Sequence, residues 1–181
     1  MKKIWLILIV FTAFAAAAGA QNPVQVGGAP MYPSKNIIQN MVNSADHTTL
    51  VAAIRSAGLA SMLEGNGSYT IFAPTNAAFA KLPKGMLTSL MRPENKPLLT
   101  KLLTYHMVAG KWDAAGIAKQ ISEGGGKAAI RTVAGGVLTA SLKGDQILLT
   151  DEKGGTATVS IKNVFQNNGV LYVIDHVLMP M

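Results

Sequence analysis

The hydrophobic pattern of the chain changes its period near residue 128, and this change restricts the fold more than any other feature. Before that point, apolar side chains recur at the three- and four-residue spacing of amphipathic helices. After it, short segments alternate between apolar and polar residues and are separated by glycine-containing turns, which predicts strands. In residues 137–143, for example, two leucines and Ala140 alternate with Thr139 and Ser141. Helices followed by strands predict an α+β domain.

Local signals place the individual elements. Ser34 is the expected N-cap of a first helix and Asp46 of a second. The clearest helix begins at Pro97 and is expected to end by Gly110, and Asp113 caps a brief helix after it. The last strand is apolar on both faces, follows a strong Asn-Asn-Gly turn signal and is expected to be central. The expected strands are residues 68–73, 131–134, 137–143, 146–150, 156–165 and 170–178.

The N-terminus predicts a secretory signal peptide over residues 1–20. Lys2 and Lys3 form a basic start, residues 4–14 are continuously apolar, and Ala18-Gly19-Ala20 fits the cleavage pattern. The apolar run is shorter than the roughly 20 residues that a membrane span needs, so an uncleaved N-terminal anchor is the less favoured alternative. Residues 21–33, rich in Pro and Gly, are expected to form a flexible lead-in to a domain over residues 34–181.

The charge of the chain argues against nucleic-acid binding. Its formal net charge is +7, and loss of the signal peptide leaves +5. After the signal peptide, the lysines never form a run and do not show the clustering, or the interleaving with aromatic residues, that is typical of a nucleic-acid binder. Loose, salt-sensitive attraction to an acidic surface stays open. The chain has no cysteine, so an exported domain of this kind must be held together by core packing instead of disulfides.

No constellation of residues predicts catalysis or a metal centre. His47, His106 and His176 are far apart, and Asp175 and His176 are expected to point to opposite faces of a strand. The sequence contains no Gly-x-Ser-x-Gly elbow. The Gly-rich segment 122–127 lacks the Walker spacing and is expected to be a flexible loop. We therefore expect no enzyme activity, no catalytic residues, no metal and no cofactor.

Three ordered segments resemble the fasciclin (FAS1) domain family. Residues 70–79, TIFAPTNAAF, are similar to the first fasciclin box, and residues 168–180, NGVLYVIDHVLMP, to the second. Between them, residues 102–110, LLTYHMVAG, are similar to the family's central Tyr-His segment. The resemblance covers residues 34–181 and implies a single secreted FAS1 domain of the bacterial type. Its fold would be a β-wedge or sandwich of about seven strands with a helical layer built mainly from the N-terminal half.

The resemblance also implies a non-catalytic binding function, in adhesion or in contacts with the cell envelope or extracellular matrix. In animal members, receptor contact involves the Tyr-His pair, here Tyr105 and His106, and an acidic-aliphatic pair before the second box. The second pair corresponds to Asn163 and Val164, so the receptor-type motif is incomplete. These four residues are the candidate partner-binding set. Structural roles, a buried histidine and a tyrosine hydrogen-bond donor, are the competing interpretation.

A carrier of an apolar small molecule, such as a carotenoid or lipid, is the alternative function, because some family members resemble soluble carotenoid binders. The chain has nine methionines, and methionine adapts to irregular apolar ligands. The expected partner is otherwise a cell-surface or matrix protein or a polysaccharide. We expect a monomer that is secreted or periplasmic and has no stable membrane insertion after cleavage.

Overall fold

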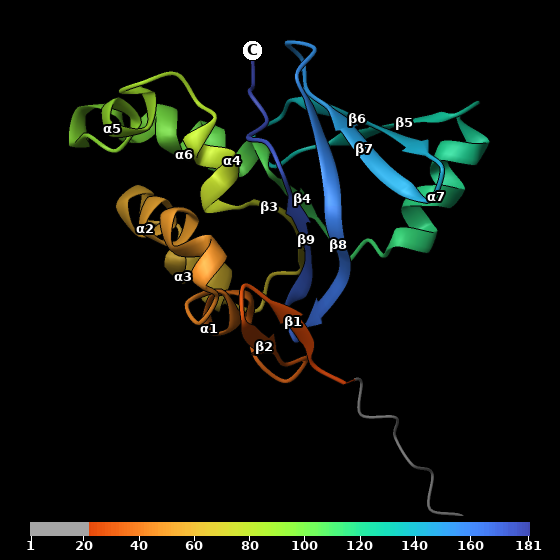
Figure 1. The fold of residues 1–181 in the computed structure, drawn as a ribbon, viewed down its shortest axis with the longest axis horizontal. Coiled ribbons are helices and arrows are strands. Elements are labelled where there is room, and N and C mark those ends of the chain that lie inside the picture. Colours follow the sequence, from red (N-terminus) through yellow and green to blue (C-terminus); the bar gives the residue numbers. More distant parts are fainter. Residues whose placement is uncertain (1–21) are drawn as a thin grey trace, which may run out of the picture.

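Within the described residues, the helices lie between Ile37 and Glu123, and most of the strand residues follow from Lys127 onward (Figure 1). The computed structural model describes residues 22–181, so the predicted signal peptide lies outside the described residues. The helices are α1 (Ile37–Met41), α2 (Thr48–Ala57), α3 (Ala60–Glu64), α4 (Asn76–Ala80), α5 (Met86–Leu90), α6 (Lys96–Tyr105) and α7 (Ala114–Glu123), with 3-10 turns at Ala45–His47 and Pro93–Asn95. The strands are β1 (Val24–Val26), β2 (Ala29–Met31), β3 (Tyr69–Pro74), β4 (Met107–Ala109), β5 (Lys127–Arg131), β6 (Val137–Lys143), β7 (Gln146–Thr150), β8 (Thr156–Gln166) and β9 (Gly169–Ile174).

Seven strands form one curved sheet in the order β4-β3-β9-β8-β7-β6-β5. Strands β3 and β9 are parallel neighbours, and the other neighbours are antiparallel. The sheet nearly closes on itself, because the amides of Val133 and Ala134 donate to the carbonyl oxygens of Met107 (2.7 Å) and Thr104 (3.2 Å). The predicted α+β class with about seven strands is confirmed.

Strand β9 lies between two hydrophobic cores, and all six of its residues are buried. On one face, Leu171 and Val173 pack against the helical layer formed by α1, α2, α3 and α6. On the other face, Tyr172 packs inside the curved sheet, with its ring centroid 5.5 Å from that of Phe72. The central position predicted for the last strand is therefore correct, and the strand ends four residues earlier than expected because pairing stops at Ile174.

The segment expected to be a flexible lead-in contains a β-hairpin that packs on the helical core. Val26 and Met31 on its two strands are each 1% exposed. Gly27 and Gly28 form the turn with φ of 57° and 76°, the left-handed pair that a two-residue hairpin turn favours. The segment is therefore an ordered β-hairpin and not a flexible lead-in. The Gly-Gly pair forms its turn, and one buried apolar residue on each three-residue strand attaches the hairpin to the helical core.

Two helix caps differ from the sequence prediction. Asn36, not Ser34, caps α1, because its Oδ1 accepts from the Gln39 amide at 2.8 Å in a capping box. Helix α2 has no cap of its own from Asp46. Its Thr49 amide instead donates to Oδ1 of Asn76 at 2.9 Å, from the first residue of α4. A residue of the first fasciclin box thus caps a helix that precedes it in the chain.

Two strand positions also differ. Helix α6 ends at Tyr105, and Met107–Ala109 forms strand β4 on β3 instead of continuing the helix to Gly110. Strand β5 begins at Lys127, four residues before the expected strand. The glycines that were expected to form a loop close the end of α7 instead, with Gly126 donating to the Ile121 carbonyl at 2.8 Å. Pairing with a neighbouring strand overrides the local pattern in both places.

None of the helices within residues 22–181 has the length and apolarity needed to cross a bilayer.

Candidate functional site

Tyr105 ends α6 with its ring buried in the core of the curved sheet. Its hydroxyl donates to the Val137 carbonyl at 2.9 Å and accepts from the Glu152 amide at 3.1 Å. Burial raises the pKa of Tyr105 to about 12, so the hydroxyl stays protonated and keeps donating at neutral pH. Tyr105 joins the end of α6 to the start of β6 and to the β7–β8 turn.

His106 follows Tyr105 and is 3% exposed. Its Nδ1 lies 2.9 Å from the Leu102 carbonyl, and its Nε2 lies 2.9 Å from the Leu178 amide. A carbonyl only accepts and an amide only donates, so these partners assign a neutral ring with the proton on Nδ1. Burial lowers the pKa of His106 to about 4. His106 therefore attaches the C-terminal segment after β9 to helix α6.

Asn163 and Val164 lie in an irregular stretch of β8, where the pairing with β9 shifts register. Asn163 has a φ of 59°, the single positive φ at a non-glycine residue within residues 22–181. Its Oδ1 accepts from the Ala114 amide at 2.7 Å and lies 3.2 Å from the Tyr172 hydroxyl. Val164 is fully buried in the helical core. Asn163 thus supplies a left-handed backbone and an acceptor for the start of α7.

The four candidate residues do not form one surface. Tyr105, His106 and Val164 are buried, Asn163 is half-buried, and no hydrogen bond between the described residues joins one pair to the other. In this conformation three of the four offer no surface to a partner, and the partner-binding role stays a prediction. The contacts support the competing interpretation that these residues build the fold.

The three histidines lie in different environments. His47 is buried, with Nδ1 2.8 Å from the Ser44 hydroxyl. His176 is exposed, and its Nδ1 lies 3.0 Å from Oδ1 of Asp175. The expectation that these neighbours point apart was wrong, because β9 ends at Ile174 and the strand alternation no longer applies. Among residues 22–181, no three His, Asp or Glu side chains gather as a metal site requires.

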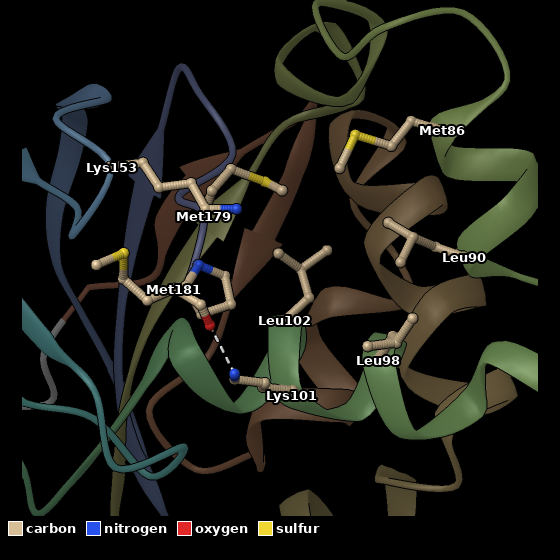
Figure 2. A pocket seen from close by; sticks show the side chains of 9 residues that line it. Met86, Leu90, Leu98, Lys101, Leu102, Lys153, Met179 and Met181 are labelled. Atoms are coloured by element: carbon tan, nitrogen blue, oxygen red, sulfur yellow. Dashed lines mark hydrogen bonds between the residues drawn. The ribbon is translucent and has the colours of Figure 1, made fainter.

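A hollow that the sequence did not predict lies between α5, α6 and the C-terminal segment (Figure 2). Its volume is about 250 Å³. Its apolar lining combines residues of the two helices with the end of the chain: Met86, Leu90, Leu98, Leu102, Met179, Pro180 and Met181. Lys101 and Lys153 complete the lining. Large apolar side chains are exposed at its edge, since Leu98 is 57% and Met181 76% exposed.

The methionine content was a partial signal for this hollow. Five methionines fall in the helical half, and one of them, Met86, lines the hollow. Met41 and Met107 are buried in the helical core, with Met62 and Met91 packed against it. The other two methionines of the hollow, Met179 and Met181, come from the end of the chain. No local pattern indicates that these segments meet.

Comparison with known proteins agrees with the resemblance of the boxes. The family model for the fasciclin domain matches residues 45–180. Protein sll1483 of Synechocystis sp. is 38% identical over 168 residues, covering 93% of this chain and 86% of the relative. The immunogenic protein MPB70 of Mycobacterium bovis is 35% identical over 170 residues, covering 91% of this chain and 78% of the relative.

A solved structure has the same fold. The FAS1 domain pair of the insect cell adhesion molecule fasciclin I superposes with a TM-score of 0.71 at 13% identity. The superposition covers 82% of this chain and 52% of the domain pair. The curved seven-stranded sheet with its helical layer, the positions of the two boxes and these matches define one class of protein. The chain belongs to the fasciclin domain family.

Proposed function

We propose that this chain is an exported, non-catalytic binding domain that attaches to cell-envelope or matrix material as an adhesion module. The fasciclin fold also occurs in an insect cell adhesion molecule. The polar side chains of the family motifs, such as Tyr105, His106 and Asn163, bond backbone groups inside this domain. A partner then has to be recognised by the outer surface.

The charge of that surface supports the proposal most. All of the lysines and arginines among residues 22–181 are exposed. Within those residues, the ion pairs that they form with carboxylates are Arg92–Glu94 at 3.9 Å and Lys119–Glu123 at 3.8 Å. The cations are spread over the surface and outnumber the carboxylates. Such a surface attracts acidic polymers weakly and over a wide area, in a salt-dependent manner.

The test is binding of the purified domain to immobilised polygalacturonate, an acidic polysaccharide, with neutral dextran as the matched matrix. We expect retention on the acidic matrix at about 0.01 M salt and release at about 1 M, where the screening length falls from about 30 Å to about 3 Å. Equal retention on both matrices, or none at low salt, would reject the charge-based surface. A monomer gives weak attachment, and display in several copies would strengthen it.

Export is the second part of the proposal, and the signal-peptide pattern of residues 1–20 supports it. Expression of the full chain in a bacterial host, followed by intact mass measurement of the periplasmic and medium fractions, tests it. A mass that begins at Gln21 is expected. A chain that keeps residue 1 and stays with the membrane would favour the N-terminal anchor.

A second candidate function is carriage of an apolar small molecule, such as a carotenoid or lipid. The observation that favours it is the hollow between α5, α6 and residues 179–181, because ligand sites are typically concave and mostly apolar. Native mass spectrometry of the purified domain tests it. A retained adduct would support carriage, and a bare chain after incubation with apolar extracts would count against it.

A further inference from the structure

We propose that the hollow between α5, α6 and residues 179–181 binds a single-chain carboxylic acid, with its hydrocarbon tail against Met86 and Met179 and its carboxylate at Lys153. This inference rests on the second candidate function, carriage, and names the ligand class for it.

The size of the hollow favours one short chain. Its volume of about 250 Å³ lies below the roughly 300–1,000 Å³ of sites for drug-sized ligands. A carotenoid or a two-chain lipid would extend well beyond a hollow of this volume, whereas a single short chain can bury much of its length in it.

The lining suits a flexible tail. Met86 enters from α5 and Met179 faces it from the C-terminal segment, with Leu102 of α6 beside them, whereas the Met181 side chain points away from the helices at the edge of the hollow (Figure 2). Unbranched thioethers rearrange around an irregular apolar chain at small cost. Leu90 and Leu98 extend the same apolar wall on the helical side. Each methylene that such a tail buries contributes to binding through the loss of contact with water.

The two lysines of the hollow, Lys101 and Lys153, differ in whether their Nζ atoms have a hydrogen-bond partner. Nζ of Lys101 donates to the Met181 oxygen at 2.6 Å. Nζ of Lys153 has no hydrogen-bond or ion-pair partner within residues 22–181, and Figure 2 shows its side chain extending across Met179 toward the helices. The neighbouring carboxylate of Glu152 is occupied, since it accepts from the amides of Met181 (3.1 Å) and Val137 (3.0 Å). No Asp or Glu side chain lines the hollow, and the Met181 carboxyl oxygen is already bonded by Lys101, so Lys153 is the lining cation without an anionic partner among residues 22–181.

An apolar groove with one unneutralised cation at its edge matches a ligand with one tail and one anionic end. The carboxylate of a free acid meets both requirements with a single charge. A neutral alcohol of equal length would fill the same volume and leave the cation unpaired. The preference for acid over alcohol therefore isolates the contribution of Lys153.

The experiment measures binding of decanoate and of decanol to the full mature domain by calorimetry, below micelle-forming concentrations. We expect one decanoate per chain and about fivefold weaker binding of decanol, the size of effect of an exposed ion pair. Lys153→Met should abolish the preference, and Lys143→Met, which removes an exposed lysine that does not line the hollow, should retain it. Methyl NMR with labelled methionine should show shifts at Met86 and Met179 but not at Met41, which is fully buried in the helical core.

The possible outcomes separate the preference for a carboxylate from the carriage of an apolar ligand. Equal binding of decanoate and decanol with shifts at Met86 would reject the carboxylate preference while carriage stands. Binding of neither compound would reject both. Equal loss of preference in the Lys153 and Lys143 variants would assign the effect to overall charge and reject the site. An unchanged Met41 resonance in each variant checks that the fold is intact.

Discussion

The backbone amide of Leu178 donates a 2.9 Å hydrogen bond to Nε2 of His106, although 72 residues separate them in the chain. The bond requires a neutral ring, because protonation places a second donor on Nε2 facing the amide. The histidine of the central family segment and the end of the second fasciclin box are therefore joined by a contact that depends on pH. The same C-terminal segment forms one wall of the hollow.

We predict that acid destabilises the domain through His106. Its pKa in the folded state is about 4, below the ordinary value of 6.5. The unfolded chain then binds more protons between these pH values, so this stability is fully present above about pH 6.5 and is lost as the pH falls toward about 4. The loss is about 3 kcal/mol. Burial also lowers the pKa of His47, which acts in the same direction. Urea unfolding across this pH range measures the effect.

The control for this prediction is the exposed His176. His176→Gln should keep the pH dependence of the wild-type domain, and His106→Gln should reduce it. Identical pH dependence in the wild type and the His106 variant would show that His106 is not the titrating group.

Tyr105→Phe should destabilise the domain by about 1–3 kcal/mol, because it leaves the Val137 carbonyl and the Glu152 amide without their shared partner. The exposed Tyr32, at 39%, provides the matched control: Tyr32→Phe should change stability by less than about 0.5 kcal/mol. Equal effects of both substitutions on the free energy of unfolding would contradict the bridging role of the Tyr105 hydroxyl.

Asn163 is expected to tolerate aspartate and not alanine. Asn163→Ala loses the acceptor for the Ala114 amide and places alanine, which adopts the left-handed region less readily than asparagine, at a φ of 59°, a combined cost of about 2 kcal/mol. Asn163→Asp keeps the acceptor and tolerates the left-handed conformation. Urea unfolding of the two variants measures the difference, and an alanine variant as stable as the aspartate variant would refute it.

Asn76→Ala should cost about 1–2 kcal/mol, because Asn76 caps α2 through the Thr49 amide and also donates to the Ala45 carbonyl at 2.8 Å. Thr75→Ala, which removes only the cap of α4 on the Ala78 amide, should cost about 1 kcal/mol. A smaller loss in the Asn76 variant than in the Thr75 variant would rule out the long-range cap as the stronger contact.

Much of the fold could be predicted from the sequence because local features determine it. The Asn-Asn-Gly turn at residues 167–169 joins β8 to β9 as expected, with Gln166 opposite Gly169. Asp113 caps α7, with its side chain accepting from the Gly116 amide at 2.7 Å. Strand β6 has the predicted bounds, and Leu138 and Ala140 of its apolar face are buried as expected, whereas Leu142 near its end is 43% exposed. Each depends on residues within a few positions of one another.

The environment of the candidate site residues was harder to predict from the sequence than the fold. The motif residues Tyr105, His106, Asn163 and Val164 were identifiable by resemblance, but their burial was not, because sequence similarity does not distinguish a residue that builds a fold from one that contacts a partner. The hairpin at residues 24–31 was missed because its two buried residues are too few for a period to be recognised. The hollow was missed because its walls come from α5, α6 and residues 179–181.

The sequence by itself therefore determined the α+β class, the turns, the caps made by near neighbours and the double burial of β9. Tertiary structure alone decided that Asn76 caps a helix that precedes it, that His106 bonds the amide of Leu178, and that Lys153 and three methionines line one hollow. The physical reason is that backbone conformation responds to adjacent residues. A side-chain donor or acceptor instead bonds whichever group the completed fold brings within about 3 Å.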